Sequence, residues 1–338
     1  NGVGLGTYGV SSSSGINLRA GAKVYSGGSA TALNWIVRYS TVQEQATTNW
    51  SSTSVAPALA FTLTSTPEPQ GQFTFTGWSL LGNRGDHLYG GKKGITPFGF
   101  KDCQFAGGGF SPNDISVALT NCLWERVALN LSSDKYDPDR FLFNNLVRVG
   151  SVSLYNDGSA TWIIKDNLFD QPTISQGGTI VHSNNAYVSG SNRLTPNNAN
   201  DVVLTNAPIY QTSYLGRYCY PTNGGLLSTL LNAGSRNSTN AGLYHYTVTT
   251  NQVKEASSTV DIGFHYVAMD SSGNPLDSDS DGVPDYLEDR NGDGIIDKKT
   301  SISHGYGVHI GFGGHGMSGV IEGPDGRIWC GLRTGLAA

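Results

Sequence analysis

The stretches FLFNNLVRV at residues 141–149 and ATWIIKDNLF at residues 160–169 contain the pattern that decides the predicted fold. In both, a polar residue is followed by Asn, then by any residue, then by an apolar one. With Cys also allowed at the second position, the pattern occurs at Asp102-Cys103-Gln104-Phe105, Asn121-Cys122-Leu123-Trp124, Asn144-Asn145-Leu146-Val147, Asp166-Asn167-Leu168-Phe169 and Asn184-Asn185-Ala186-Tyr187. Successive second positions lie 19, 23, 22 and 18 residues apart.

This spacing is about the length of one turn of a parallel β-helix, in which equivalent residues of successive turns stack above one another. The chain is rich in short segments of aromatic and β-branched residues bounded by turn formers, and apolar residues at helical spacing are rare. We therefore predict an all-β solenoid with the second positions in one column, about 4.8 Å apart. Asn amides would pair along this column, and Cys103 and Cys122 would be buried thiols.

Two later segments resemble a known family. LLNAGSRNSTNAGLYHYTV at residues 230–248 and STVDIGFHYVA at residues 258–268 look like the closing turns of bacterial secreted right-handed parallel β-helix proteins of the pectate-lyase-like type. The resemblance implies a right-handed parallel β-helix over about residues 70–268. That fold carries lyases, hydrolases, adhesins and phage tailspikes alike, so it does not imply a particular function.

Changes in composition divide the chain into four parts. Residues 1–70 are interpreted as a β cap or as the first turns of the solenoid, and residues 71–268 as the parallel β-helix. Residues 269–300 are rich in Asp, and residues 301–338 form a Gly- and His-rich tail. The chain begins with Asn rather than Met, which we interpret as a processed or truncated start.

The Asp-rich part carries the strongest chemical motif. Ca²⁺ prefers six to eight oxygen ligands, and alternate acidic residues on a loop that turns at a Gly bring such oxygens together. Gly282 is the turning residue of the first loop. Position 12 of the second loop, where a bidentate carboxylate would be expected, is Thr300, so that site should be weaker or share a ligand. The predicted ligands are Asp277, Asp279, Asp281, Val283 through its carbonyl, Asp285 and Glu288 in the first loop, and Asp289, Asn291, Asp293, Ile295 through its carbonyl and Asp297 in the second.

These tandem loops resemble the thrombospondin type 3 repeats of bacterial secreted proteins, which implies Ca²⁺ as the cofactor. The alternative is an acidic, solvated linker that binds nothing. Because the second loop lacks the bidentate carboxylate, we expect its site to be the weaker one. Extracellular calcium near millimolar suits weak sites, and for this reason we expect an extracellular or cell-surface location.

Composition excludes some partners. Charged residues make up 14% of the chain and the formal net charge is -5, so a basic surface for nucleic acid is not expected. No window of 18 apolar residues is present, and no membrane span is predicted. We expect Trp78, Trp124 and Trp162 in the core and Trp50 on the surface, where it could stack on a sugar.

Catalytic candidates are weaker than the calcium motif. One loop gathers Asp134, Lys135, Asp137, Asp139 and Arg140, and another gathers Arg84, Asp86, His87, Lys92 and Lys93. Both are interpreted as solvated or salt-bridged turns. His304, His309 and His315 in the tail do not share the spacing of a helix face, so metal binding there is not expected.

The leading functional hypothesis is a non-catalytic, calcium-binding module of the cell surface or exterior, adhesin-like or associated with polysaccharide. The alternatives are a polysaccharide lyase or glycoside hydrolase on the same fold, and a subunit of an extracellular fibre that self-associates. Extracellular polysaccharide or another copy of the chain would be the partner.

Overall fold

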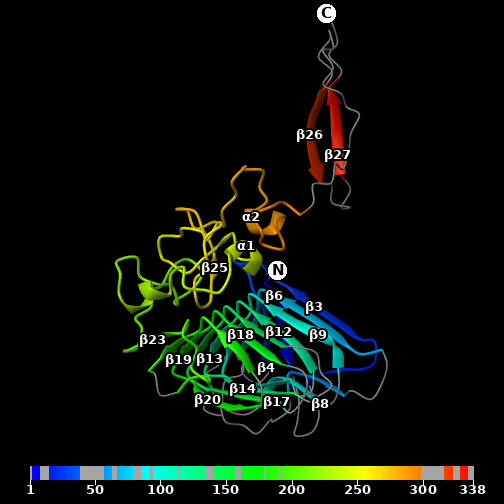
Figure 1. Ribbon diagram of the computed structural model, residues 1–338. Coiled ribbons are helices and arrows are strands. Elements are labelled where there is room, and N and C mark those ends of the chain that lie inside the picture. The colour runs from blue at the N-terminus through cyan, green and yellow to red at the C-terminus, as the bar shows by residue number, and fades with distance from the viewer. Residues whose placement is uncertain are drawn as a thin grey trace, which may run out of the picture. The chain divides into compact units, whose positions relative to one another are not determined.

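The computed structural model describes residues 2–7, 15–38, 57–62, 67–79, 85–91, 94–112, 115–133, 140–156, 161–178, 180–189, 192–297, 316–322 and 328–333. Two compact units are present, Asn1–Ile295 and Ile296–Ala338. The first is a right-handed parallel β-helix, which confirms the predicted fold (Figure 1). The second contains an antiparallel pair, β26 (Gly316–Glu322) and β27 (Ile328–Arg333).

Over the described residues, the first seven turns of the solenoid each contribute one strand to each of three parallel sheets, and β22 and β23 add two further strands to the first sheet. Sheet A has nine strands: β1 (Gly4–Thr7), β4 (Asn34–Arg38), β7 (Thr76–Ser79), β10 (Gln104–Ala106), β13 (Leu123–Glu125), β16 (Leu146–Arg148), β19 (Leu168–Asp170), β22 (Ala186–Val188) and β23 (Val202–Leu204). Sheet B has seven strands: β2 (Ile16–Leu18), β5 (Leu59–Thr62), β8 (Asp86–Gly91), β11 (Gly109–Pro112), β14 (Ala128–Ser133), β17 (Ser151–Asn156) and β20 (Thr173–Gly177). Sheet C has seven strands: β3 (Lys23–Gly27), β6 (Gln70–Thr74), β9 (Gly94–Lys101), β12 (Ile115–Thr120), β15 (Arg140–Phe143), β18 (Trp162–Lys165) and β21 (Ile180–Ser183).

The second residues of the repeated pattern form the predicted column at the start of sheet A. Strand register places Cys103, Cys122, Asn145, Asn167 and Asn185 next to one another on successive turns. Asn145 Nδ2 donates to Asn167 Oδ1 at 2.9 Å, and Asn167 Nδ2 donates to Asn185 Oδ1 at 2.9 Å. This column, the Asn ladder, also satisfies backbone groups that the corner leaves without a sheet partner.

The ladder cysteines take the place of Asn without a disulfide. Cys103 and Cys122 are free and fully buried, as predicted. The Cys122 thiol lies 3.5 Å from the carbonyl oxygen of Phe100, and the Cys103 thiol lies 3.4 Å from that of Phe73. A weak S–H donor therefore occupies the position from which the Asn amides donate to the preceding turn.

The first residues of the pattern turn the corner before each ladder residue. All five have a positive φ, between 50° and 62°, namely Asp102, Asn121, Asn144, Asp166 and Asn184. Phe75, one turn before Asp102, has a φ of 46°. Asn and Asp adopt this left-handed conformation more readily than other residues that have a Cβ. The repeated Asx pair therefore has two separate roles, because the first residue bends the backbone and the second closes it with hydrogen bonds.

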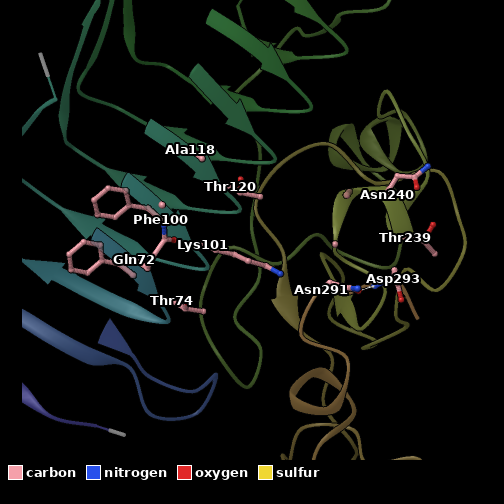
Figure 2. Close-up of a pocket in the computed structure, with 14 residues that line it drawn as sticks. Gln72, Thr74, Phe100, Lys101, Ala118, Thr120, Thr239, Asn240, Asn291 and Asp293 are labelled. Carbon is pink, nitrogen blue, oxygen red and sulfur yellow. Dashed lines mark hydrogen bonds between the residues drawn. The ribbon is translucent and has the colours of Figure 1, made fainter. Parts of the chain in front are cut away.

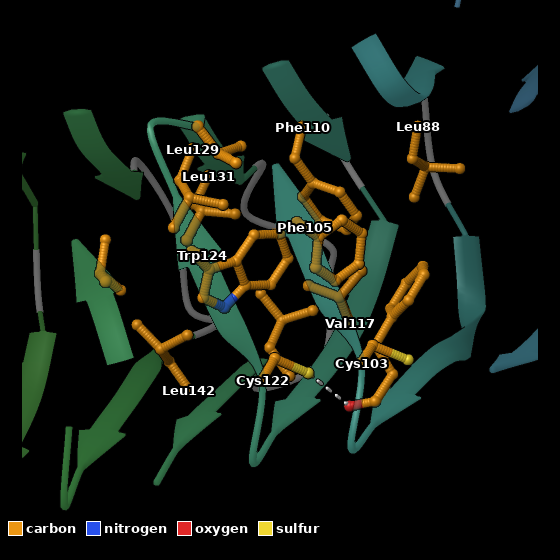
Figure 3. Close-up of a cluster of buried hydrophobic side chains, with 14 of the residues drawn as sticks. Leu88, Cys103, Phe105, Phe110, Val117, Cys122, Trp124, Leu129, Leu131 and Leu142 are labelled. Atoms are coloured by element: carbon orange, nitrogen blue, oxygen red, sulfur yellow. Dashed lines mark hydrogen bonds between the residues drawn. The ribbon is translucent and has the colours of Figure 1, made fainter. Parts of the chain in front are cut away.

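Apolar residues two positions beyond the ladder fill the interior. The rings of Phe105 and Trp124 stack at 3.9 Å, and those of Trp78 and Phe105 at 5.6 Å. Trp78, Trp124 and Trp162 are all buried, as predicted. Figure 3 shows Trp124 and Phe105 side by side among aliphatic side chains, above the two ladder cysteines.

Residues 205–295 leave the solenoid and pack back against it, and are called here the docked segment. It contains the short η2 (Leu226–Leu230), α1 (Ser238–Ala241) and α2 (Asp285–Glu288), and the antiparallel pair β24 (Tyr246–Thr247) and β25 (Tyr266–Val267). Its apolar residues cover the outer row of sheet A at Leu123, Leu146, Leu168 and Ala186. Residues 205–268 were assigned to the solenoid from sequence, but the described parallel strands end at Leu204.

The corner residues also anchor the docked segment. Arg236 donates to Asp166 at 2.7 Å and to Asn144 at 2.8 Å. Asn121 donates to the carbonyl oxygen of His265 and accepts from its backbone N–H. Tyr246 donates its hydroxyl to Asp102 at 2.9 Å. The corner column is thus a polar seam under the docked segment, and its groups are buried and paired.

The strands within residues 4–62 belong to the same three sheets as those that follow, so this region contributes early turns of the solenoid. No helix in the described part of the chain is long and apolar enough to cross a membrane.

Candidate metal centre

The first predicted calcium loop gathers three carboxylates. One oxygen each of Asp277, Asp279 and Asp281 lies within 4.8 Å of the other two. Asp277 accepts from the backbone N–H groups of Ser280 at 2.8 Å and Gly282 at 3.0 Å, and this pairing holds the loop closed. Gly282 has a φ of 92°, which fits its predicted role as the turning residue.

The second loop repeats this backbone geometry twelve residues later. Asp289 takes the place of Asp277 and accepts from Gly292 at 2.8 Å and from Gly294 at 2.6 Å. Gly294 has a φ of 89°, close to that of Gly282. The remaining oxygens follow the same order, because Asn291 accepts from Asp293 N–H and Asp293 accepts from Ile295 N–H. Two loops with one hydrogen-bonding scheme indicate a tandem repeat rather than an irregular acidic linker.

Helix α2 lies between the two loops and contacts the solenoid. Its residue Tyr286 is buried, and the Tyr286 hydroxyl accepts from the backbone N–H of Ala30 at 3.2 Å. The Tyr286 ring packs edge-on against Phe75, with 5.5 Å between the centroids. An interaction that stabilises the loops should therefore also stabilise this contact between the docked segment and the early turns of the solenoid.

Asp285 lies outside the three-carboxylate group of the first loop. Its side chain accepts from the N–H and the hydroxyl of Ser278, at 2.6 and 2.7 Å, and lies 3.8 Å from the ammonium of Lys254. Burial by itself raises the pKa of Asp285, but these hydrogen bonds and the nearby positive charge outweigh it and lower the pKa. Asp285 thus remains ionised and connects the loop to α2.

His245 joins the second loop to an earlier part of the docked segment. Its Nε2 lies 2.9 Å from Asp289 Oδ2, and its Nδ1 lies 3.7 Å from Asp285. Burial lowers the pKa of His245, although Asp289 opposes that effect. His245 and Lys254 lie far from the loops in sequence, and no local pattern marks them as neighbours of the carboxylates.

The other predicted ligands lie around these loops. Glu288 is half-buried at the end of α2, while Val283 and Ile295 have exposed side chains, as suits residues that offer only a carbonyl. Asp297 is exposed at the end of the described segment. The converging donors are oxygens, several of them anionic, and this donor set fits a hard cation such as Ca²⁺ rather than a soft one.

A polar groove lies beside the second loop, between sheet C and the docked segment. Its volume is about 580 Å³, and Asn291 and Asp293 form part of one wall. Figure 2 shows Lys101 extending from the sheet toward Asn291, with Thr239 and Asn240 on the far side. Phe73 and Phe100 also line it, but both are 1% exposed and belong to the interior.

The other sequence candidates do not form a described site. Asp134, Lys135, Asp137, Asp139, Arg84, Lys92, Lys93, Trp50, His304, His309 and His315 lie outside the described residues. Arg140 is buried, with its guanidinium 5.7 Å from the Trp162 ring. Burial lowers the pKa of His87 to about 4, and its Nε2 lies 2.8 Å from the carbonyl oxygen of Gly107, so its environment is that of a core residue.

Sequence reasoning did not find a buried charged group inside the docked segment. Glu255, Asp261 and His265 bring their side chains within 4.8 Å of one another. His265 Nε2 lies 3.0 Å from Glu255 Oε1, and His265 Nδ1 donates to the carbonyl of Gly263. Burial, together with the charge of Glu255, raises the pKa of Asp261 to about 7. The three residues lie within eleven positions of the sequence, but their spacing matches no known motif.

Comparison of the chain with protein-family models, with curated proteins and with solved structures finds no match in any of the three.

Proposed function

We propose that the chain is a non-catalytic, extracellular or cell-surface β-helix protein, adhesin-like or associated with polysaccharide, whose docked segment is fastened by Ca²⁺. The solenoid supplies a long, rigid surface with few charges. The two loops at residues 277–297 supply the calcium ligands, and α2 transmits their ordering to the solenoid.

The observation that carries this proposal is the arrangement of two like loops on either side of Tyr286. Six acidic residues fall between Asp277 and Asp289, and without a cation their repulsion opposes a closed loop. Binding of Ca²⁺ to the closed loop alone stabilises it by mass action, by about 2.7 kcal/mol when free calcium is a hundred times the dissociation constant. The contact of Tyr286 with Ala30 and Phe75 gains from the same free energy.

The extracellular location follows from the expected strength of the sites. Loops of this type outside the cell bind with dissociation constants of roughly 10⁻⁴ to 10⁻³ M, near the calcium concentration there. The first loop has three converging carboxylates, whereas Asn291 replaces one of them in the second. We therefore expect the first site to bind more tightly.

Isothermal titration with CaCl₂ tests the two sites separately. Asp281→Ala removes a central oxygen of the first loop and should weaken calcium binding about tenfold or more, because the remaining carboxylates no longer surround the ion. Asp297→Ala affects the second loop and should have a smaller effect on the tighter site. Asp270→Asn, outside both loops, is the control. Equal affinities for the two Ala variants, or no calcium uptake by the parent at millimolar metal, would refute the proposal.

A further inference from the structure

A second cleft opens on the outer face of sheet A, away from the calcium loops. It has a volume of about 280 Å³ and lies where the docked segment stops covering the sheet. Trp35, Gln104, Ala106 and Glu125 line it from the sheet, and Arg217 and Tyr218 line it from the docked segment. The size is near the lower end of the roughly 300–1,000 Å³ typical of small-molecule sites.

Trp35 is placed outward by the ladder. Trp35 follows Asn34, which pairs with Thr76 at the ladder position. The next residue, Ile36, is buried in the interior, so the side chain of Trp35 points to the opposite, outer face of the strand. The neighbour of Trp35 on the next strand is Gly77, and a Cβ there would lie 2.5 to 2.8 Å from three atoms of the indole. The ring therefore lies over a backbone that has no side chain. Trp35 is 41% exposed, whereas Trp78, Trp124 and Trp162 are at most 1% exposed.

Part of the lining is polar, and its charged side chains are paired. Arg217 donates to Glu125 at 2.6 Å, and Tyr218 also hydrogen-bonds to that carboxylate. The Arg217 guanidinium lies 5.4 Å from the centre of the Tyr218 ring, which holds it in place. Among the described residues that line the cleft, Glu125 and Arg217 carry the formal charges and pair with each other. Arg126 and Arg148, outside the lining, lie 3.9 and 3.7 Å from the same carboxylate.

These features select for one class of ligand. The exposed face of Trp35 favours a ligand with a flat apolar side. The Gln104 amide, together with the paired Glu125 carboxylate and Arg217 guanidinium, favours a ligand rich in hydroxyl groups. A pyranose ring has both properties. A nucleotide would also stack on Trp35, but its phosphate would meet no unpaired cation in the described lining. The polar groove beside the second loop has no exposed aromatic residue in its lining and offers no such platform.

We propose that this cleft binds a neutral mono- or disaccharide unit of a glycan, which stacks on Trp35 and is hydrogen-bonded by Gln104, Glu125 and Arg217. The inference rests on the proposed polysaccharide-associated function and gives that function a site. It requires no calcium ion in the cleft, because none of the calcium-loop residues lines it.

A glycan array with neutral and acidic oligosaccharides, followed by titration calorimetry of the neutral sugars it retains, tests the site on the full chain. Trp35→Ala should weaken binding at least tenfold because the stacking face is lost, and Trp35→Phe should restore most of it. Gln104→Ala should also weaken binding and avoids any packing defect at Trp35. Tyr25→Ala is the matched control, since Tyr25 is an aromatic residue of sheet C that is 63% exposed and does not line this cleft.

Calcium titration of the same proteins separates this proposal from the function on which it rests. A parent that binds calcium but retains no neutral sugar would overturn the cleft alone. A parent that binds sugar but no calcium would overturn the calcium proposal and leave the cleft intact. Equal sugar affinity of parent and Trp35→Ala, or retention of acidic sugars alone, would also overturn the cleft.

Discussion

Single residues of the repeat carry more than one structural role. Asn167 is fully buried and donates to Leu142, Lys165 and Asn185, while its oxygen accepts from Asn145. The bonds to Leu142, Asn185 and Asn145 are buried, and the bond to Lys165 is partly buried. An unpaired buried polar group costs about 1–3 kcal/mol, so substitutions in the ladder should lower the free energy of unfolding substantially.

Asn167→Ala should lower the free energy of unfolding by about 2–4 kcal/mol, because several buried groups lose their partner at once. Urea denaturation followed by circular dichroism measures this change. Asn200→Ala, at an exposed position, should change stability by less than about 0.5 kcal/mol. A loss at Asn167 no larger than that at Asn200 would contradict the role given to the ladder.

The residue pattern predicted the ladder and the interior because both depend on spacing along the chain. It did not reveal Trp35, although the same pattern applied to Asn34-Trp35-Ile36 places that Trp outside. It also gave no sign of His245 and Lys254 beside the calcium loops, since those contacts arise when distant segments fold together. Local periodicity is visible in a sequence, whereas the partners of a docked surface are set by tertiary packing.

Among the elements, the docked segment differs from the solenoid in how it is stabilised. It has few strands, and it holds its shape through buried polar groups such as Glu255, Asp261 and His265. The pKa of Asp261 is about 7 in the folded protein, well above the 3.8 that is usual for an aspartate. Because the folded state binds this proton more tightly than the unfolded state, the stabilising contribution of protonated Asp261 is complete below pH 4 and is lost as the pH rises through 7.

Asp261→Asn mimics the protonated carboxyl and should remove this dependence. The variant should match the parent in stability near pH 4 and exceed it by at most about 4 kcal/mol above pH 7, since one pKa unit corresponds to about 1.4 kcal/mol. Denaturation of both proteins across this pH range gives the difference directly. A difference that stays constant with pH, or grows as the pH falls, would show that Asp261 does not carry the buried proton.

In the first unit, the end of the docked segment contacts early turns of the solenoid, and this is the contact that the proposed calcium ions would stabilise. The predicted calcium loops lie at the end of the docked segment, and α2 between them packs on Ala30 and Phe75 in the early turns of the solenoid. Elsewhere the docked segment is held along the corner column, from Tyr246 at Asp102 to Arg236 at Asn144 and Asp166. Calcium binding should therefore protect the contact at the early turns more than the rest of the seam.

Hydrogen exchange with and without calcium, read by mass spectrometry on the full chain, tests this most directly. In millimolar calcium, peptides covering residues 277–297 should exchange up to about a hundredfold more slowly than in chelator, and peptides around residues 28–33 should gain protection with them. Peptides from the ladder strands at residues 141–149 should not change. Identical exchange at residues 277–297 in calcium and in chelator would contradict the claim that calcium fastens the docked segment to the β-helix.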